Sequence, residues 1–150
     1  MDRCHSRSVR MALFTALLGM SLMAVTSSFA ANGHMTTKFE GVKANNGTAI
    51  HTRQGNTDVL TWSDDYKVPD TPAPHWQVVD SKGNIYLLQQ QRIKGDKHNK
   101  SIVLPPYVHD VVKVQVWCSF AEAILGEASF SSPITTASGE RDSSMMSAGR

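Results

Sequence analysis

The chain has 150 residues, with 15 lysine and arginine residues against 13 aspartate and glutamate residues. Residues 1–30 contain three arginines and one aspartate, so the remainder holds 12 basic (15 − 3) and 12 acidic (13 − 1) residues. A chain without net charge offers no electrostatic surface to nucleic acid or to an anionic membrane. We therefore exclude nucleic-acid binding and expect one domain of about 120 residues, which is large enough to bury a core.

Residues 1–30 have the layout of a secretory signal peptide. Three arginines precede an almost unbroken apolar run over residues 11–25, and Ser28-Phe29-Ala30 supplies small residues before a cleavage site. A transmembrane helix needs about 20 apolar residues, and this run is shorter. The sequence predicts cleavage after Ala30 and export to the periplasm or the extracellular space, with no stable membrane span after cleavage.

Short β-prone runs alternate with turn residues from residue 38 onward. Asn45-Asn46-Gly47 and Ser81-Lys82-Gly83-Asn84 predict tight hairpins, and the three prolines of residues 69–74 predict a connection between two sheets. This spacing predicts an all-β fold, an antiparallel β-sandwich or related barrel of about eight strands. The expected strands are 38–42, 48–53, 58–63, 75–80, 85–90, 101–104, 113–120 and 124–130.

These runs set the expected boundaries of the domain. Residues 31–37 form an N-terminal lead, and residues 38–132 form the β domain. Residues 133–150 are Ser, Gly, Met and charged residues without a hydrophobic period, which predicts a disordered tail.

Cys118 is the only cysteine outside the predicted signal peptide, because Cys4 lies within it. An unpaired cysteine in an oxidising compartment is buried and inert, paired between chains, or used chemically. Val114, Val116, Cys118 and Phe120 share one face of an alternating strand, so we expect Cys118 to face the core. The same alternation predicts that serine at this position destabilises the protein more than alanine, because its hydroxyl would be buried without a partner.

A reactive thiol needs a neighbouring cation or donor that lowers its pKa. Lys113 and Trp117 lie on the opposite face of the same strand, so a cationic partner has to come from another strand. The residues that we consider as possible neighbours of a redox-active Cys118 are Trp117, His51, His75 and His109.

The spacing of histidines and cysteines does not predict a metal site. A type-one copper site combines two histidines, a cysteine and an axial methionine, but no histidine follows Cys118 in the chain. A zinc site has four ligands, and the histidines lack paired spacing. The covalent haem motif Cys-x-x-Cys-His is also absent, and a haem-like group bound through Cys118 or a histidine stays open.

Several short segments share one further pattern: Phe39-Glu40-Gly41, Gly47-Thr48-Ala49, Asp64-Asp65-Tyr66, Pro72-Ala73-Pro74-His75-Trp76-Gln77-Val78, Val116-Trp117-Cys118-Ser119-Phe120 and Gly126-Glu127-Ala128. Together they resemble the DM-thirteen domain, an extracellular module that often accompanies DOMON domains. The resemblance implies an all-β fold of about eight strands and a redox or electron-transfer role centred on the cysteine, here Cys118. The chain differs from the usual arrangement because it carries no DOMON-like domain.

Two functions stay open on the sequence. In the first, the protein is a redox module in which Cys118 exchanges electrons with a partner protein. In the second, it is a non-catalytic binding or protein-interaction module, and Cys118 is a buried core residue. In neither case do we expect an enzyme in its own right.

Overall fold

The computed structural model describes residues 34–94 and 97–148. Their elements follow the order β1 (His34–Met35), β2 (Ala49–Gln54), β3 (Thr57–Trp62), β4 (Pro74–Val79), β5 (Ile85–Gln90), β6 (Arg92–Lys94), β7 (Lys97–His98), β8 (Ser101–Val103), β9 (Asp110–Cys118), β10 (Ala123–Thr135) and α1 (Ala137–Ala148). No helix among these residues is long and apolar enough to cross a membrane. The predicted signal peptide, residues 1–30, lies outside the described part of the chain.

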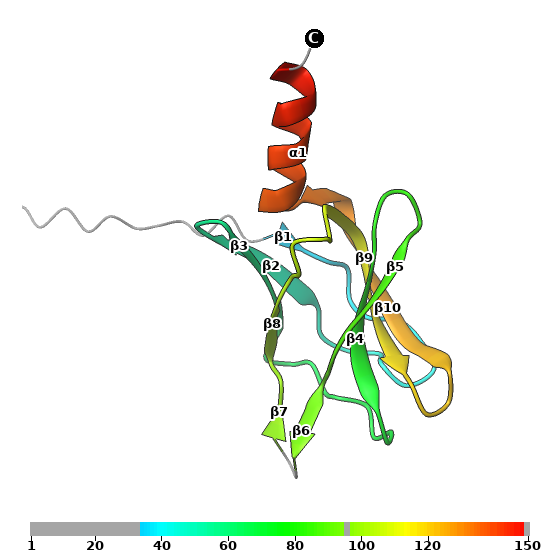
Figure 1. The fold of residues 1–150 in the computed structure, drawn as a ribbon. Coiled ribbons are helices and arrows are strands. Elements are labelled where there is room, and N and C mark those ends of the chain that lie inside the picture. The colour runs from blue at the N-terminus through cyan, green and yellow to red at the C-terminus, as the bar shows by residue number, and fades with distance from the viewer. Residues whose placement is uncertain (1–33, 95–96, 149–150) are drawn as a thin grey trace, which may run out of the picture.

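The strands form two antiparallel four-stranded sheets that face each other as a sandwich (Figure 1). One sheet has the order β1-β2-β3-β8 and the other has the order β10-β9-β4-β5, while β6 and β7 pair as a small separate hairpin. Large buried side chains from both sheets fill the space between them, with Leu60 and Trp62 from β3 and Trp76 and Val78 from β4. The predicted all-β antiparallel sandwich is confirmed.

The proline-rich connection and the second hairpin also agree with the sequence. Residues 69–74 lead from β3 in one sheet to β4 in the other. Between β4 and β5, the Asp80 carboxylate accepts hydrogen bonds from the N–H groups of Lys82 and Asn84, and Gly83 has a φ of 84°. An acidic side chain that bonds to the backbone after it, together with a glycine at positive φ, stabilises this turn.

Residues 38–42 do not form the strand that the sequence predicts. Glu40 makes only one isolated bridge, to Glu127 of β10. Gly41 lies so close to the same strand that a Cβ atom would be 2.3 Å from the Cα of Gly126. The segment therefore packs against β10 as irregular backbone, and Asn46-Gly47 does not close a hairpin.

The domain extends past both predicted boundaries. In the expected lead, His34 and Met35 form β1 and pair with β2. The prediction of a disordered tail is wrong for residues 133–148, because β10 continues to Thr135 after a shift in register and α1 follows. The residues of α1 show no apolar spacing of a helical period, so the sequence pattern does not predict this helix. Its first turn is held by the Asp58 carboxylate of β3, which accepts a hydrogen bond from the Ala137 N–H, and by the Thr136 hydroxyl, which caps the Gly139 N–H.

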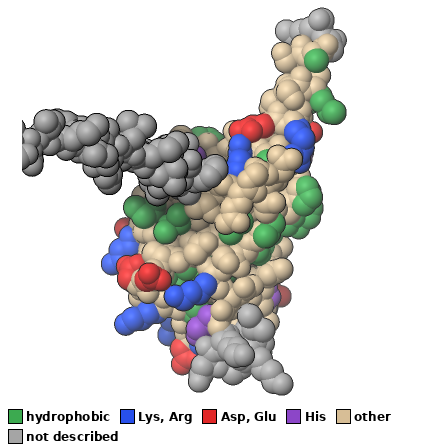
Figure 2. All heavy atoms as spheres, turned by 90° about the vertical axis from the view of Figure 1, so that its left-hand side faces the viewer, with side chains coloured by type: hydrophobic (Ala, Val, Ile, Leu, Met, Phe, Trp, Pro, Cys, Tyr) green, Lys and Arg blue, Asp and Glu red, His purple; other side chains and the backbone are tan. Residues whose placement is uncertain are grey.

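Beyond this first turn, α1 stands clear of the sandwich (Figures 1 and 2). All side chains from Glu140 to Ala148 are exposed. In Figure 2, acidic and basic side chains lie next to each other on the visible face, without a large area of one sign.

Candidate functional site

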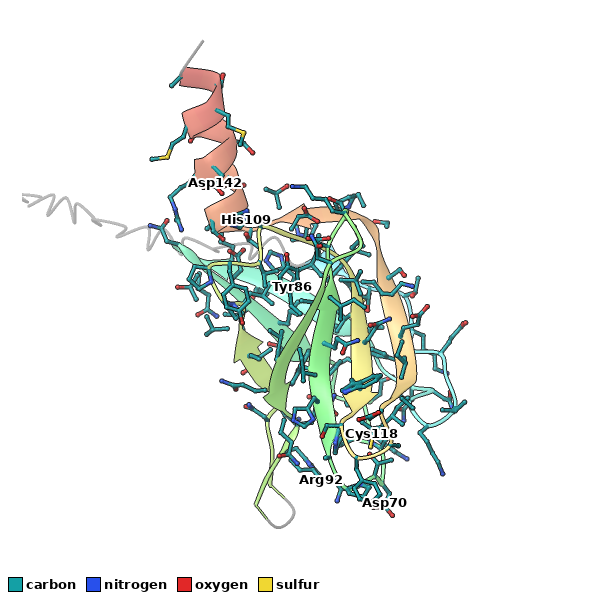
Figure 3. The ribbon with its side chains drawn as sticks, turned by 45° about the vertical axis from the view of Figure 1, so that its right-hand side comes forward. Asp70, Tyr86, Arg92, His109, Cys118 and Asp142 are labelled. Carbon is teal, nitrogen blue, oxygen red and sulfur yellow. The ribbon has the colours of Figure 1, made fainter. Side chains whose placement is uncertain are left out.

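Cys118 lies at the end of β9, at the end of the sandwich opposite α1 (Figure 3). It is 1% exposed and belongs to the hydrophobic core, as the alternation predicts. The expectation that Phe120 shares this face is wrong, because β9 ends at Cys118 and Phe120 is 77% exposed. Residues 119–122 instead form the turn to β10, and Glu122 adopts a left-handed φ of 49° in it.

Four groups that can donate hydrogen bonds lie near the Cys118 sulfur. They are the main-chain N–H groups of Ala121, Phe120 and Ala73 and the hydroxyl of Thr71, and we call these four residues the sulfur cradle. Burial raises the pKa of the Cys118 thiol, but the four donors together lower it below its ordinary value. The Thr71 hydroxyl is buried and makes no hydrogen bond within the described part of the chain. The thiolate form of Cys118 is therefore stabilised without a cationic neighbour.

The structure places only one of the three candidate histidines beside the Cys118 strand end. His75 follows Pro74, the residue that pairs with Cys118, and is itself paired with Trp117. Both His75 and Trp117 are half-buried and alternate with core residues, so their side chains lie on the outer face of the sheet. The His75 ring uses its Nδ1 in a hydrogen bond to the Ala73 carbonyl, at 2.9 Å.

His51 and His109 lie near α1, at the other end of the molecule, so neither is a neighbour of Cys118. His109 contacts Asp142 of α1, with 3.2 Å between Nδ1 and Oδ2. His51, in β2, belongs to a second constellation described below. Lys113 also lies away from the sulfur, and its ammonium group contacts Glu127 at 2.8 Å.

The second constellation is centred on the buried Asp58 of β3. Its Oδ1 accepts hydrogen bonds from His51 Nε2 at 2.9 Å and from Arg53 Nε at 3.1 Å. Its Oδ2 accepts a hydrogen bond from the Ala137 N–H at 2.7 Å, which ties the first turn of α1 to the sheet. Burial raises the pKa of Asp58, but the donors from Ala137, His51 and Arg53 outweigh it and lower the pKa. Asp58 is therefore a carboxylate at neutral pH.

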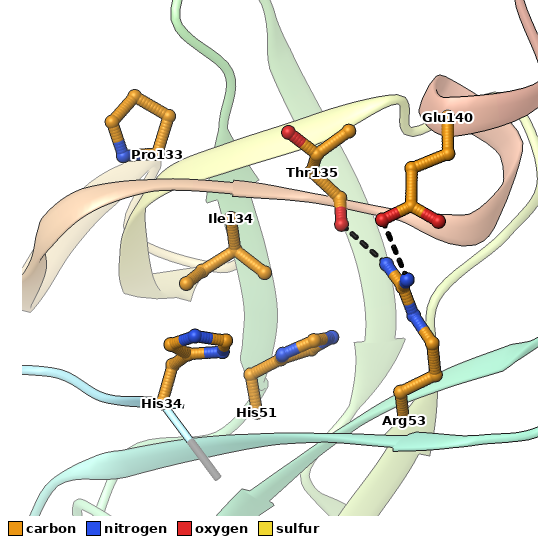
Figure 4. Close-up of a pocket in the computed structure, with 7 residues that line it drawn as sticks. All are labelled: His34, His51, Arg53, Pro133, Ile134, Thr135 and Glu140. Carbon is orange, nitrogen blue, oxygen red and sulfur yellow. Dashed lines mark hydrogen bonds and ion pairs between the residues drawn. The ribbon is translucent and has the colours of Figure 1, made fainter. Parts of the chain in front are cut away.

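Beside this network lies a cavity of about 330 Å³, which we call the histidine pocket (Figure 4). Arg53 crosses one side of it, with Nη1 bonded to Glu140 at 2.7 Å and Nη2 bonded to the Thr135 carbonyl. The residues that line the pocket are His34, His51, Arg53, Pro133, Ile134, Thr135 and Glu140.

His51 presents an unused nitrogen at this pocket. Its side chain is 3% exposed, and its Nδ1 is buried without a hydrogen-bond partner. Burial lowers the pKa of His51, and the contacts with Asp58 offset this only in part, so the ring is neutral at pH 7. Because Nε2 donates its hydrogen to the Asp58 carboxylate, Nδ1 carries a lone pair.

Our reading of the sequence did not identify Asp58 or the sulfur cradle. For Asp58 a signal exists, because alternation places it on the same face as Leu60 and Trp62, and an acidic residue on an apolar face is uncommon. For the cradle only Thr71 carries a side-chain signal, since the other donors are main-chain groups. No family model, curated protein or solved structure matches this chain.

Proposed function

We propose that this protein is an exported redox module whose reactive group is the Cys118 thiolate. The observation that carries the proposal is the convergence of four donors on the sulfur. A cysteine that merely fills a core has a raised pKa, because burial disfavours the charged form. Hydrogen-bond donors near the sulfur lower the thiol pKa instead, because they favour the charged, nucleophilic thiolate.

The reaction that fits one cysteine is thiol–disulfide exchange with a partner protein. The Cys118 thiolate attacks one sulfur of the partner's disulfide, a new S–S bond forms, and the other partner sulfur leaves as a thiolate with the electron pair of the broken bond. The product is a mixed disulfide between the two proteins. A second thiol, from the partner or from solution, then attacks the mixed disulfide and releases Cys118.

Access to the sulfur requires the turn of residues 119–122 to move, because Cys118 is 1% exposed. All four residues of this turn are exposed. Displacing the turn therefore removes little apolar surface from the core, so its local opening costs much less than unfolding of the domain. Phe120 and Ala121 belong to this turn, so Ala73 and Thr71 are the cradle residues that keep their places when the turn opens.

Two features of the sequence support this proposal. The predicted signal peptide takes the chain to a compartment in which disulfides persist. The resemblance to the DM-thirteen domain links the closing cysteine strand with a redox role. The low exposure of Cys118 favours the alternative, a non-catalytic binding or protein-interaction module with a buried core cysteine.

The test measures how the alkylation rate of the native thiol depends on pH. We expect the rate to reach half its maximum below the ordinary thiol pKa of about 8.5. The substitution Thr71→Val removes one donor of the sulfur cradle and raises this midpoint. Thr57→Val, at an exposed position in β3, is the matched control and leaves it unchanged. A thiol that reacts only after denaturation refutes the redox proposal and supports the binding module.

A further inference from the structure

We propose that His34 and His51 form a binding site for a divalent transition-metal ion, in which Asp58 orients His51. This site is independent of Cys118 and lies at the α1 end of the sandwich (Figure 4). The class of ion follows from the donors, since neutral imidazole suits zinc, copper and nickel.

The two histidines are direct cross-strand partners. His34 of β1 is paired with His51 of β2, so their side chains leave the sheet on the same face. Their ring centroids are 5.7 Å apart and the ring planes are inclined by 24°. Two imidazoles that bind one ion, each through a nitrogen about 2.0–2.1 Å from it, have ring centres at a comparable separation. Both side chains line the same pocket, which gives the ion a path from solvent.

His51 has the surroundings of a metal-ligating histidine. Such residues donate the hydrogen of one ring nitrogen to a carboxylate or carbonyl, which fixes the tautomer and leaves the other nitrogen for the metal. Here Nε2 donates to Asp58 at 2.9 Å, and Asp58 is itself held by Arg53 and by the Ala137 N–H. The remaining nitrogen, Nδ1, is buried and has no partner. A buried acceptor without a hydrogen bond lowers the stability of the folded protein, and a metal ion bound to this nitrogen removes that cost.

The charges around the pocket are compatible with a cation. The guanidinium group of Arg53 is balanced by Asp58 and Glu140, and the Glu140 carboxylate lies on the pocket wall. Within residues 34–94 and 97–148, no group of three or more His, Cys, Asp or Glu side chains could hold a metal ion. The protein therefore supplies two ligands, and water or a second molecule occupies the other positions.

With two protein ligands, this site is expected to bind the ion more weakly than a closed structural zinc site with four. The spacing of the histidines in the sequence did not predict this metal site, because His34 and His51 meet only through the pairing of β1 with β2. Residues 34 and 35 were expected to belong to a lead outside the domain.

The test is a zinc titration of the full chain, followed by calorimetry and by NMR of the histidine ring nitrogens. We expect one equivalent of Zn²⁺ to shift the ring signals of both His34 and His51. We expect His34→Gln to weaken binding by roughly tenfold or more. His34 is exposed, so this variant keeps the fold.

Two controls make the result specific. His98→Gln removes another exposed histidine and is expected to leave the affinity unchanged. Cys118→Ala removes the thiol as a competing ligand and also leaves it unchanged. A titration that shifts His34 without His51, or an affinity unaffected by His34→Gln, overturns the proposal. Neither result bears on the reactivity of Cys118, so the two proposals fail separately.

Discussion

The substitution Asp58→Asn is a direct test of the network that joins the sheet to α1. Asp58 is 4% exposed and accepts hydrogen bonds from His51, Arg53 and Ala137. Asparagine has nearly the same shape but only one carbonyl oxygen, and its amide group is a donor. Whichever way the amide is turned, this donor faces either the Ala137 N–H or the donors from His51 and Arg53.

The expected loss follows from these contacts. At least one buried donor is left without an acceptor, which costs about 1–3 kcal/mol. The remaining hydrogen bonds lose the charge of the carboxylate and become weaker, and the nearby guanidinium group of Arg53 loses a partner. We therefore expect the free energy of unfolding to fall by about 2–4 kcal/mol.

Urea unfolding measures this loss through the midpoint of the transition. Asp64→Asn is the matched control, because the Asp64 side chain is fully exposed and pairs with Lys100 at 3.3 Å. An exposed pair of this kind contributes less than about 1 kcal/mol. Equal midpoints for the two variants would show that the contacts of Asp58 do not stabilise the fold, and would refute the reasoning.

The same network predicts a pH dependence. The pKa of Asp58 is lower in the folded protein than in the unfolded chain, where it is about 3.9. The stabilisation from its ionised form is therefore complete above the unfolded pKa and is lost as the pH falls through the folded value. The difference in stability between the wild-type protein and Asp58→Asn should shrink over this acidic range in urea unfolding.

Three further substitutions test other parts of the structure. The alternation alone predicts that Cys118→Ser is less stable than Cys118→Ala, but the groups around the sulfur offer donors to the serine hydroxyl, so we now expect serine to cost no more than the roughly 1 kcal/mol of alanine. Urea midpoints compare the two variants, and a much less stable serine variant means that the donors do not reach the hydroxyl. Gly126→Ala places a Cβ atom 2.4 Å from the Ala44 carbonyl oxygen and should cost about 1–3 kcal/mol, seen as a lower melting temperature. Gln77→Ala removes the donor to Gln115 Oε1, which lies at 2.7 Å in a buried pair, and should cost about 1–3 kcal/mol in urea unfolding. An unchanged melting temperature or urea midpoint in either variant would contradict the packing or the hydrogen bond concerned.

Local patterns predicted the strands well, because alternation is a property of consecutive residues. Val114, Val116 and Cys118 face the core as the alternation predicts. The pattern failed at Phe120, because β9 ends at Cys118 and the period of two has no meaning within a turn. The same alternation places Asp58 on the apolar face of β3, so this buried carboxylate could have been predicted from the sequence.

The sites depend on pairings that local patterns do not contain. His34 meets His51 through the register of two strands, and α1 exists because Asp58, Thr136 and Arg53 hold its first turn. The sulfur cradle combines the Thr71 hydroxyl with main-chain N–H groups from two loops. Every residue type except proline has a main-chain N–H, so composition and spacing do not identify these donors.

The position of α1 determines the orientation of this protein when its C-terminal end is attached to a fusion partner or a solid support. The helix has 12 residues and is about 18 Å long, and its exposed side chains leave it free of the sandwich over most of that length. It places the C-terminal end away from the sandwich, so a fusion partner or a solid support joined after Ala148 stays clear of the sheets. Because Cys118 lies at the far end (Figure 3), a chain tethered in this way points the Cys118 end of the sandwich away from the support. Immobilisation through the C-terminus therefore leaves that end free for an approaching protein.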